Sequence, residues 1–304
     1  MNYLITGASG FIGRHLCLRL NSMSLDFTSI SHTSFRSQEV TNIPNAEVVI
    51  HLAGKAHILN ERGADLDSDY YEANCAYALE VARSAARNGL KRFVYVSSIG
   101  VYGKSHSKNP LTESAEVKPI ESYAKSKLKA EIKLKKLSKE LCFELVIVRP
   151  ALVYGFDAPG NIKRLQKFVH SFPIIPFAER GNVRSFVYIE NLIDFLILSA
   201  THKNAANQVF NVADDEPVST YALISALSSG MRHRRLLFSL PRGMLKMILR
   251  VAGRNKMYEQ LFGDLVLDIS FAKSQLNWKP RYRTKEALST AGKGYISNLR
   301  KDNK

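Results

Sequence analysis

Hydrophobic residues in the first half of the chain fall into short apolar runs separated by longer amphipathic segments. The runs are typical of buried strands, and the amphipathic segments are typical of helices. Strands are expected at residues 46–54, 91–98 and 143–150, and helices at 70–89 and from about Ser122 onward. This alternation predicts an α/β fold on a doubly wound parallel sheet, in which ligands bind at the carboxyl ends of the strands.

The pattern weakens in the second half, where irregular segments separate the apolar stretches. Helices are expected at 161–173 and 220–231, and a strand near 208–213 is expected to return to the main sheet. We therefore expect residues 1–150 to form the sheet domain. Residues 151–304 should form mainly a smaller C-terminal lobe that binds the substrate.

The segment KLKAEIKLKKLSKEL, residues 127–141, predicts an amphipathic helix. Its expected apolar stripe consists of Leu128, Ile132, Leu134 and Leu137. Most of its lysines are expected to face solvent.

The chain opens with a strand, a glycine-rich turn and a helix, in the segments YLIT, GASGFIG and RHLCLRL. Gly7 would permit the tight turn after the strand, Gly10 would let a pyrophosphate approach the backbone, and Gly13 would let the helix pack closely on the sheet. Free N–H groups and the helix dipole favour an anion at such a helix start. A glycine triplet in this context predicts a Rossmann dinucleotide-binding site.

Three segments that follow predicted strands should meet at this site: the glycine loop, residues 51–54, and the serine pair Ser97–Ser98. Because the carboxyl ends of parallel strands share one edge of a sheet, these segments should line one crevice. Besides the three glycines, we expect the cofactor to contact Ser9, Phe11, Ile12, Leu52, Ala53, Gly54 and Asn74.

The segment SYAKSK places Tyr123 and Lys127 four residues apart, on one face of a helix. Two ordinary surface side chains would show the same spacing. Beside a dinucleotide and Ser98, however, the pair permits a known chemistry, in which tyrosine exchanges a proton with a sugar hydroxyl while hydride moves between the carbon and nicotinamide. Ser98 would hold the substrate oxygen, and Lys127 could anchor the nicotinamide ribose.

This chemistry requires Tyr123 to be partly ionised near neutral pH, although the reference pKa of tyrosine is about 10. Lowering that pKa by about three units takes roughly 4 kcal/mol. A cation about 4 Å away supplies about this much at an effective dielectric constant of about 20. Lys127 is therefore expected to lower the pKa of Tyr123, and an oxidised nicotinamide would add to the effect.

These motifs resemble, in order and spacing, the extended short-chain dehydrogenase/reductases of the NAD-dependent epimerase/dehydratase family. The first half carries TGASGFIG, VVIHLAG, YVSSIGVYG, SYAKSK and VRPALVYG, while RSFVYIENL, QVFNVADDEPVS and LNWKPRY look like the family's second half. The chain looks most like bacterial enzymes of surface-polysaccharide synthesis, O-antigen synthesis included. Those enzymes epimerise C4 of UDP-linked sugars or reduce a 4-keto group there.

The resemblance implies that Ser98, Tyr123 and Lys127 are catalytic and that the three glycines bind pyrophosphate. It also implies that Arg184, in RSFVYIENL, pairs with the UDP phosphates. An ordinary surface ion pair is the alternative for this arginine. The cofactor would be NAD or NADP, the substrate a UDP-sugar, and the assembly a homodimer.

Three functions remain open at this stage. The first is an NAD(P)-dependent 4-epimerase that acts on a UDP-hexose or UDP-N-acetylhexosamine. The second is an NAD(P)H-dependent 4-keto-sugar reductase that makes a UDP-6-deoxy-hexosamine. The third is a non-catalytic dinucleotide sensor, which would have no reason to keep Ser98, Tyr123 and Lys127 together.

The second strand departs from the family pattern. An acid usually ends that strand and bonds the ribose hydroxyls, whereas residues 27–31 are followed by His32 and Thr33, and Asp26 lies at the strand's other end. His32 and Arg36 could instead meet a 2′-phosphate, or could be ordinary loop residues. This departure favours NADP or mixed use.

Two more departures concern binding contacts. The segment between Ser31 and Ile50 is short for the family, so the usual third strand near the adenine is expected to be trimmed. Leu152 stands where many members have Asn, so one substrate contact is expected to be absent or supplied elsewhere.

Composition adds charge to this picture. The 304 residues carry a net charge of +16, from 43 Lys and Arg against 27 Asp and Glu, which suits an anionic substrate. No nucleic-acid-binding motif accompanies the charge, so no nucleic-acid partner is expected. Residues 240–254 predict a basic amphipathic helix that packs within the small lobe or, alternatively, makes a weak peripheral contact with the membrane.

The three cysteines, Cys17, Cys75 and Cys142, show no metal-ligand spacing, so neither a zinc site nor a disulfide framework is expected. No apolar run is long enough to span a membrane. The start of the chain shows no secretory signal. Together these features predict a cytoplasmic protein without a metal site.

Overall fold

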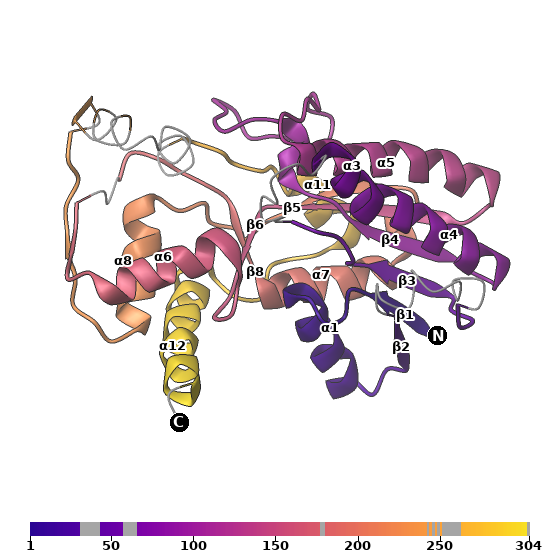
Figure 1. The fold of residues 1–304 in the computed structure, drawn as a ribbon, viewed down its shortest axis with the longest axis horizontal. Helices are drawn as coiled ribbons and strands as arrows, with labels where there is room; N and C mark the ends of the chain where they lie inside the picture. Colours follow the sequence, from indigo (N-terminus) through magenta and orange to yellow (C-terminus); the bar gives the residue numbers. More distant parts are fainter. Residues whose placement is uncertain are drawn as a thin grey trace.

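The computed structural model describes most of the chain, namely residues 1–30, 43–56, 66–176, 180–241, 243–244, 247, 250 and 263–302. Figure 1 shows its elements along the sequence. The strands are β1 (Tyr3–Thr6), β2 (Phe27–Ile30), β3 (Val48–His51), β4 (Arg92–Val96), β5 (Glu144–Pro150), β6 (Leu152–Tyr154), β7 (Ile174–Ile175), β8 (Phe186–Tyr188), β9 (Val209–Val212) and β10 (Leu236–Leu237). The α-helices are α1 (Phe11–Ser22), α3 (Leu66–Tyr71), α4 (Tyr77–Arg87), α5 (Ser122–Glu140), α6 (Gly160–Ser171), α7 (Ile189–Thr201), α8 (Thr220–Gly230), α11 (Ser270–Leu276) and α12 (Thr284–Asp302).

A parallel sheet of six strands forms the centre of the larger part of the molecule, in the order β2-β1-β3-β4-β5-β9. Helices α1 and α7 cover one face of the sheet, and α3, α4 and α5 cover the other (Figure 1). Each face has its own hydrophobic core cluster. The doubly wound α/β sheet expected from the alternating pattern is confirmed.

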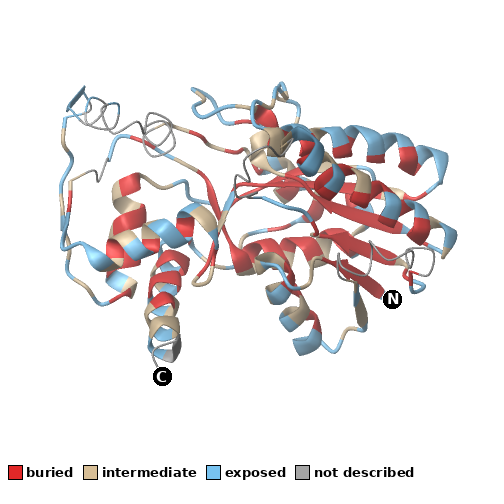
Figure 2. Cartoon of the chain, in the orientation of Figure 1, coloured by how far each residue is buried: buried red, intermediate tan, exposed pale blue. Residues whose placement is uncertain are grey.

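The inner strands are apolar because helices cover both faces of the sheet. Every residue of β3 (VVIH) and β4 (RFVYV) is buried, as Figure 2 shows for the centre of the sheet. Such continuous burial is typical of parallel strands between two helical layers. Strand β2 is the outermost strand on its side of the sheet among the described residues, and it is only partly buried.

A second, smaller lobe contains α6, α8 and α12 together with the short strand pair β7–β10. Helices α8 and α12 approach each other closely at Gly292, where a Cβ atom would lie 2.3 Å from the carbonyl oxygen of Leu227. The chain passes between the two parts more than once, because β9 pairs with β5 in the main sheet. A domain boundary near residue 150 therefore stays a prediction.

Two helices differ from the sequence expectation. The helix expected at 70–89 begins earlier, at Leu66, and contains a π-helical turn at Glu72–Ala76 before α4. In α5 the expected apolar stripe is wrong at Ile132, which is 60% exposed, whereas Leu134 is fully buried. The reason is that the buried face of this helix includes the polar residues Lys127 and Glu131, which have partners inside the protein.

The remaining expectations concern the membrane and the thiols. The helix expected at 240–254 lies largely outside the described residues, so its packing and its membrane contact stay predictions. Across the described ranges, no helix combines the length and apolar character needed to cross a bilayer. The three cysteine thiols are not paired with one another.

Candidate active site

The glycine loop between β1 and α1 is built by close backbone contacts. Gly7 has a φ of +71°, and a Cβ atom there would lie 2.7 Å from the backbone nitrogen of Ala53. The N–H of Gly10 donates to the carbonyl of Gly7 at 3.0 Å, and a Cβ on Gly13 would lie only 2.1 Å from that same carbonyl oxygen. Side chains at Gly7 and Gly13 are therefore excluded by backbone atoms.

Gly10 differs from its two neighbours in the loop. A Cβ atom on Gly10 would meet only the carbonyl oxygen of Gly7, at 3.2 Å, so its outer side is open. Gly10 also precedes α1 as its N-cap, with extended backbone angles and no side-chain cap. An open glycine at a helix N-terminus fits a pyrophosphate group, so the residues present suit a dinucleotide. Ser9, Phe11 and Ile12 flank this glycine in the loop and in the first turn of α1.

The segment after β3 lies against both the glycine loop and α5. Leu52 and Ala53 contact Gly7, as its close approach shows. Gly54 has a φ of +156°, and a Cβ atom there would lie 2.5 Å from the side-chain oxygen of Asn74 and 3.4 Å from Nζ of Lys127. The structure thus brings together the cradle, the end of β3 and the lysine of the YxxxK motif.

Thr6 and His51 are buried, and they hold the segment after β3 through hydrogen bonds. The N–H of Ala53 donates to Oγ1 of Thr6 at 3.2 Å, and this oxygen lies 3.0 Å from Nδ1 of His51. Burial lowers the pKa of His51 to about 3, with a further contribution from the charge of Lys127, so the imidazole is neutral. His51 therefore lies in the core and, through Thr6, helps to fix the segment that follows β3.

Asn74 lies on the π-helical turn and connects two parts of the site. Its side-chain amide accepts from the N–H of Lys55 at 2.8 Å and donates to the carbonyl of Lys55 at 3.1 Å and to Oγ of Ser126 at 3.0 Å. Its own carbonyl accepts from the hydroxyl of Tyr95 at 3.2 Å. The amide thus ties the chain after Gly54 to helix α5, and π turns often occur at such functional positions.

Ser98 lies near Tyr123, which lies near Lys127, and Lys127 in turn lies beside Gly54. The hydroxyl of Ser98 caps the following 3₁₀ turn, accepting from Gly100 at 3.0 Å, and it lies near enough to Tyr123 to lower the pKa of that phenol in part. Nζ of Lys127 donates to the carbonyl of Val96 at 2.9 Å and lies 6.0 Å from the centre of the Tyr123 ring. The three side chains proposed from the sequence therefore occupy one site.

The expectation that Lys127 lowers the pKa of Tyr123 is wrong for the protein without its cofactor, because the pKa of Tyr123 is raised there. Desolvation raises the pKa of Tyr123 to about 12, the hydrogen bond with Ser98 lowers it only in part, and the neighbouring Tyr70 raises it further. Desolvation also lowers the pKa of Lys127, to about 8. Lys127 is not among the groups that shift the pKa of Tyr123, and its Nζ lies 6.0 Å from the centre of the ring, so the cost of removing a phenolate from water prevails.

Arg184 lies where segments of both halves of the chain meet. Its guanidinium donates to the carbonyl of Gly263 at 2.9 Å and to the carbonyl of Ser105 at 3.2 Å. Its backbone pairs with Val218. Burial lowers the pKa of the guanidinium, and the negative charge of Asp264 offsets only part of this effect. The expected contact of Arg184 with the UDP phosphates of the substrate stays a prediction.

The other predicted contacts divide into two groups. His32 and Arg36 lie outside the described residues. Leu152 begins β6 beside Phe186 of β8 and is 45% exposed, so it presents an apolar surface where many family members have Asn.

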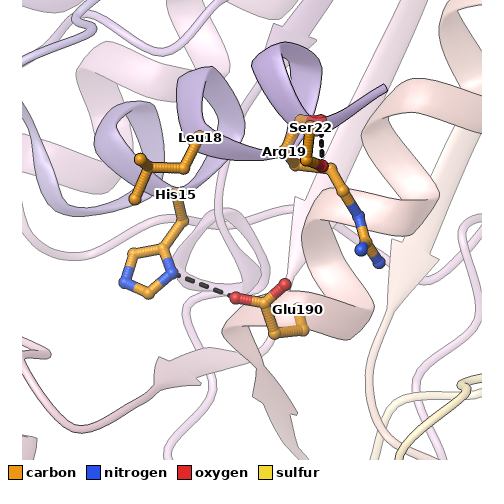
Figure 3. Close-up of a pocket in the computed structure, with 5 residues that line it drawn as sticks. All are labelled: His15, Leu18, Arg19, Ser22 and Glu190. Carbon is orange, nitrogen blue, oxygen red and sulfur yellow. Dashed lines mark hydrogen bonds and ion pairs between the residues drawn. The ribbon is translucent and has the colours of Figure 1, made fainter. Parts of the chain in front are cut away.

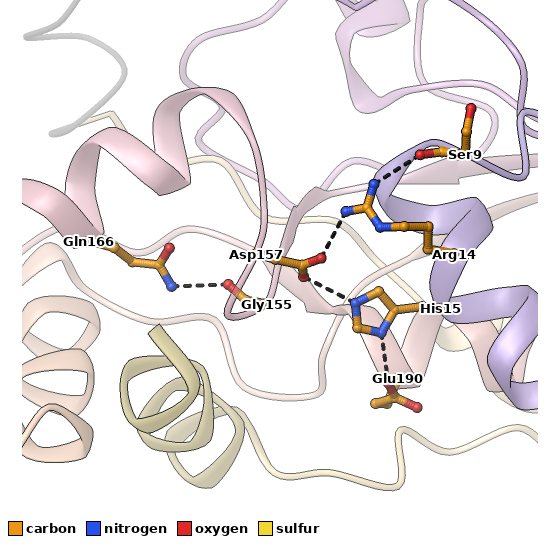
Figure 4. A network of polar contacts seen from close by, with 7 residues as sticks. All are labelled: Ser9, Arg14, His15, Gly155, Asp157, Gln166 and Glu190. Atoms are coloured by element: carbon orange, nitrogen blue, oxygen red, sulfur yellow. Dashed lines mark hydrogen bonds and ion pairs between the residues drawn. The ribbon is translucent and has the colours of Figure 1, made fainter. Parts of the chain in front are cut away.

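A charged cluster joins the glycine loop to the chain that enters α6 (Figure 4). Arg14 donates to the carbonyl of Ser9 at 2.9 Å and to Asp157 at 2.9 Å. His15 lies between two carboxylates, 3.1 Å from an oxygen of Asp157 and 3.1 Å from an oxygen of Glu190. Arg14, His15, Asp157 and Glu190 were not anticipated as a cluster, because nothing in their local sequences indicates which distant charges meet.

A pocket of about 200 Å³ opens beside this cluster along α1 (Figure 3). Its lining consists of His15, Leu18, Arg19, Ser22 and Glu190. None of the proposed catalytic residues Ser98, Tyr123 and Lys127 lines it.

Comparison with known proteins identifies the family of the chain. The model of the NAD dependent epimerase/dehydratase family matches residues 3–213. The chain belongs to this family. A UDP-glucose 4-epimerase of Vibrio cholerae is 31% identical over 311 residues, which cover 96% of this chain and 95% of that protein.

Two further proteins widen the comparison. A dTDP-4-dehydro-6-deoxyglucose reductase of Escherichia coli is 24% identical over 313 residues, covering 91% of this chain and 92% of that protein. The solved structure of a UDP-glucose 4-epimerase from Thermotoga maritima with UDP-glucose superposes with a TM-score of 0.77 at 20% identity, covering 98% of this chain and 100% of that one. The protein is therefore an NAD(P)-dependent enzyme of the short-chain dehydrogenase/reductase type, as its motifs indicated, and the sensor alternative is set aside.

Proposed function

We propose that the protein is a 4-epimerase of a UDP-hexose or UDP-N-acetylhexosamine. The observation that carries this proposal is the proximity of Ser98, Tyr123 and Lys127 to one another, with Lys127 beside Gly54 of the segment that contacts the glycine loop. A proton acceptor, an oxygen-binding hydroxyl and a cation thus lie beside a cradle that fits a dinucleotide. The similarity to the Vibrio cholerae enzyme over nearly the whole chain supports the same reaction.

In this mechanism the hydroxyl of Ser98 holds the oxygen on C4 of the sugar, and the phenolate of Tyr123 accepts the proton of that hydroxyl. The glycine loop would hold NAD, which would supply reversible hydride transfer at C4 and, while oxidised, a positive charge that favours the phenolate. After the 4-keto sugar has rotated within the site, Tyr123 returns its proton to the same oxygen. The product is the C4 epimer, with no net oxidation.

The positive charge of the cofactor has a specific task in this scheme. Because burial raises the pKa of Tyr123 to about 12, the ammonium of Lys127 does not by itself produce a phenolate near neutral pH. Lys127 and the oxidised nicotinamide would therefore have to act together. Proton abstraction would then be strongest in the state that is ready to accept hydride.

The direct test is incubation of purified protein with UDP-glucose or UDP-N-acetylglucosamine and no added reductant. We expect NMR spectra to show the C4 epimer accumulating to equilibrium. No product from either sugar, together with consumption of NADPH on a 4-keto nucleotide sugar, would overturn the proposal.

That second outcome describes the runner-up function, a 4-keto-sugar reductase. It is favoured by the similarity to the Escherichia coli reductase. It is also favoured by β2, whose nearest acid, Asp26, precedes the strand and lies at the end away from the crevice. An epimerase must retain its cofactor between the two hydride transfers, so mass spectrometry of the protein as purified should detect bound NAD.

Variants at Tyr123 and Arg184 separate chemistry from binding. We expect Tyr123→Phe to lower kcat by about 10²- to 10⁴-fold, because the proton acceptor is lost. Affinity for UDP-glucose, measured by calorimetry, should change little. Arg184→Met should weaken the affinity for UDP without changing that for NAD if this arginine meets the phosphates.

The homodimer and the cytoplasmic location stay predictions. Light scattering of the purified protein would measure the assembly directly, and a monomer at all concentrations would show the homodimer expectation to be wrong.

A further inference from the structure

A buried ion pair lies one helical turn beyond Lys127. Glu131 is 1% exposed and Arg149 is 4% exposed. The guanidinium of Arg149 donates twice to the carboxylate of Glu131, at 3.1 Å to one oxygen and at 2.6 Å to the other. The hydroxyl of Ser97 donates a third hydrogen bond to this carboxylate, at 2.5 Å. Glu131 is thus fixed by three donors.

These partners come from the elements that carry the proposed catalytic residues. Glu131 lies on α5 and shares a face with Tyr123 and Lys127, since the three residues are spaced four apart. Ser97 directly follows β4 and precedes Ser98, while Arg149 lies near the end of β5. The ion pair therefore ties the catalytic helix to the ends of two central strands.

We propose that Glu131 is a positioning residue that anchors helix α5 beside Ser98 and supplies a fixed, buried negative charge one helical turn from Lys127. This proposal rests on the proposed function for the roles of Ser98 and Lys127. Glu131 itself touches neither the crevice glycines nor the tyrosine hydroxyl in the contacts of the structure, so it acts through Lys127 and through the position of the helix.

Within the described part of the chain, the other titratable groups near Lys127 carry no negative charge that could stabilise its ammonium. Tyr95 lies on β4 with its ring centre 4.9 Å from Nζ, and burial raises its pKa, so it is not an anion. His51 is neutral, and Tyr123 keeps its proton because its pKa is about 12. Among the described residues, Glu131 is the carboxylate whose charge raises the pKa of Lys127 against the effect of burial.

The consequence concerns the charge state of the catalytic lysine. Burial lowers the pKa of Lys127 and the charge of Glu131 raises it, and together they give a pKa of about 8. The ammonium is therefore only moderately favoured near neutral pH. Loss of the Glu131 charge would also leave Arg149 as an unpaired cation nearby, which acts in the same direction. Removing the carboxylate should therefore lower the protonated fraction of Lys127 near neutral pH, where its charge would help to stabilise the phenolate.

The test is an NMR titration of lysine ¹³Cε signals in the full chain, with the Lys127 signal assigned from its loss in Lys127→Met. For Glu131→Gln we expect the midpoint of Lys127 to fall by about one unit. Glu131→Asp keeps the charge and should largely restore the midpoint. Arg149→Met removes the opposing cation and should move the midpoint upward.

Tyr102→Phe is the matched control. It removes hydrogen bonds to Arg149 at 3.1 Å and to Asn211 at 2.7 Å within the same buried network, but it leaves the carboxylate in place. It should lower the melting temperature without moving the Lys127 midpoint. A purely structural role for Glu131 predicts equal midpoints in all four variants, and that result would overturn the proposal.

The variants also protect the test against failure to fold. If Glu131→Gln does not fold, the upward shift in Arg149→Met and the retained midpoint in Glu131→Asp decide the question, and a downward or absent shift in Arg149→Met contradicts the proposal. The titration needs no turnover, so it stands even if no UDP-sugar is epimerised. Where the epimerase is active, the pH limb of kcat assigned to Lys127 should move with the midpoint.

Discussion

Nε2 of His15 lies 3.1 Å from a carboxylate oxygen of Asp157, which joins the helix of the glycine loop to the chain that enters α6. The other ring nitrogen meets Glu190 at the start of α7. Desolvation lowers the pKa of His15, but the hydrogen bonds and charges of Asp157 and Glu190 outweigh it and raise the pKa to about 9. The imidazolium therefore connects three segments that surround the nucleotide loop.

This raised pKa predicts a pH-dependent stability. A histidine whose pKa is higher in the folded than in the unfolded state stabilises the fold fully below its unfolded pKa of 6.5. This stabilisation is lost as the pH rises through the folded pKa of about 9. His15→Gln should therefore lower the melting temperature by several degrees at about pH 6, and the difference from wild type should shrink at about pH 10. Thermal melts of both proteins at the two pH values measure this effect, and an equal difference at both would contradict it.

Gly13→Ala should disrupt the nucleotide loop. The new Cβ atom would lie 2.1 Å from the carbonyl oxygen of Gly7 and 2.7 Å from Cα of Ala8, and both contacts are to backbone that cannot move aside cheaply. We expect a stability loss of about 1–3 kcal/mol and at least a tenfold weaker affinity for NAD, measured by calorimetry. Gly243→Ala is the control, because a Cβ atom there meets nothing within 4 Å.

Leu134 and Ile132 should respond very differently to truncation. Leu134 is fully buried in the core beneath α5, whereas Ile132 on the same helix is 60% exposed. Leu134→Ala should cost about 2–4 kcal/mol of unfolding free energy in urea titrations, because it leaves a cavity. Ile132→Ala should stay within about 0.5 kcal/mol of wild type. Similar losses at the two positions would refute the burial described for α5.

Cys142 offers a site for stabilisation. It follows the end of α5 with a φ of +57°, and the N–H of Phe143 donates to the carbonyl of Ser138 at 3.1 Å in the turn that closes the helix. Glycine adopts this left-handed conformation without strain, so Cys142→Gly should raise the unfolding free energy by about 0.5–1 kcal/mol. Cys142→Ala also removes the exposed thiol but should bring no gain, and equal effects of the two changes would show that backbone strain is not the cause.

Much of the fold follows from local patterns. The order of strands and helices was predictable because burial between two helical layers makes each central strand a short apolar run, and Gly7 and Gly13 were identifiable because no side chain fits where their backbones meet their neighbours. The shared face of Tyr123 and Lys127 was equally predictable, since helical geometry depends only on spacing. Glu131 has the same spacing from Lys127, and this was the available signal for its burial.

What the sequence by itself determined, then, was the parallel α/β architecture, the glycine cradle and the family of the enzyme, because each depends on residues close together in the chain. Only the tertiary structure decided the pKa of Tyr123, the pairing of Glu131 with Arg149 and the charged bridge at His15. These depend on how far folding excludes water from each group and on which distant segments meet, such as His15 and Glu190, which are 175 positions apart. Desolvation and pairing act through space, so no local pattern encodes their balance.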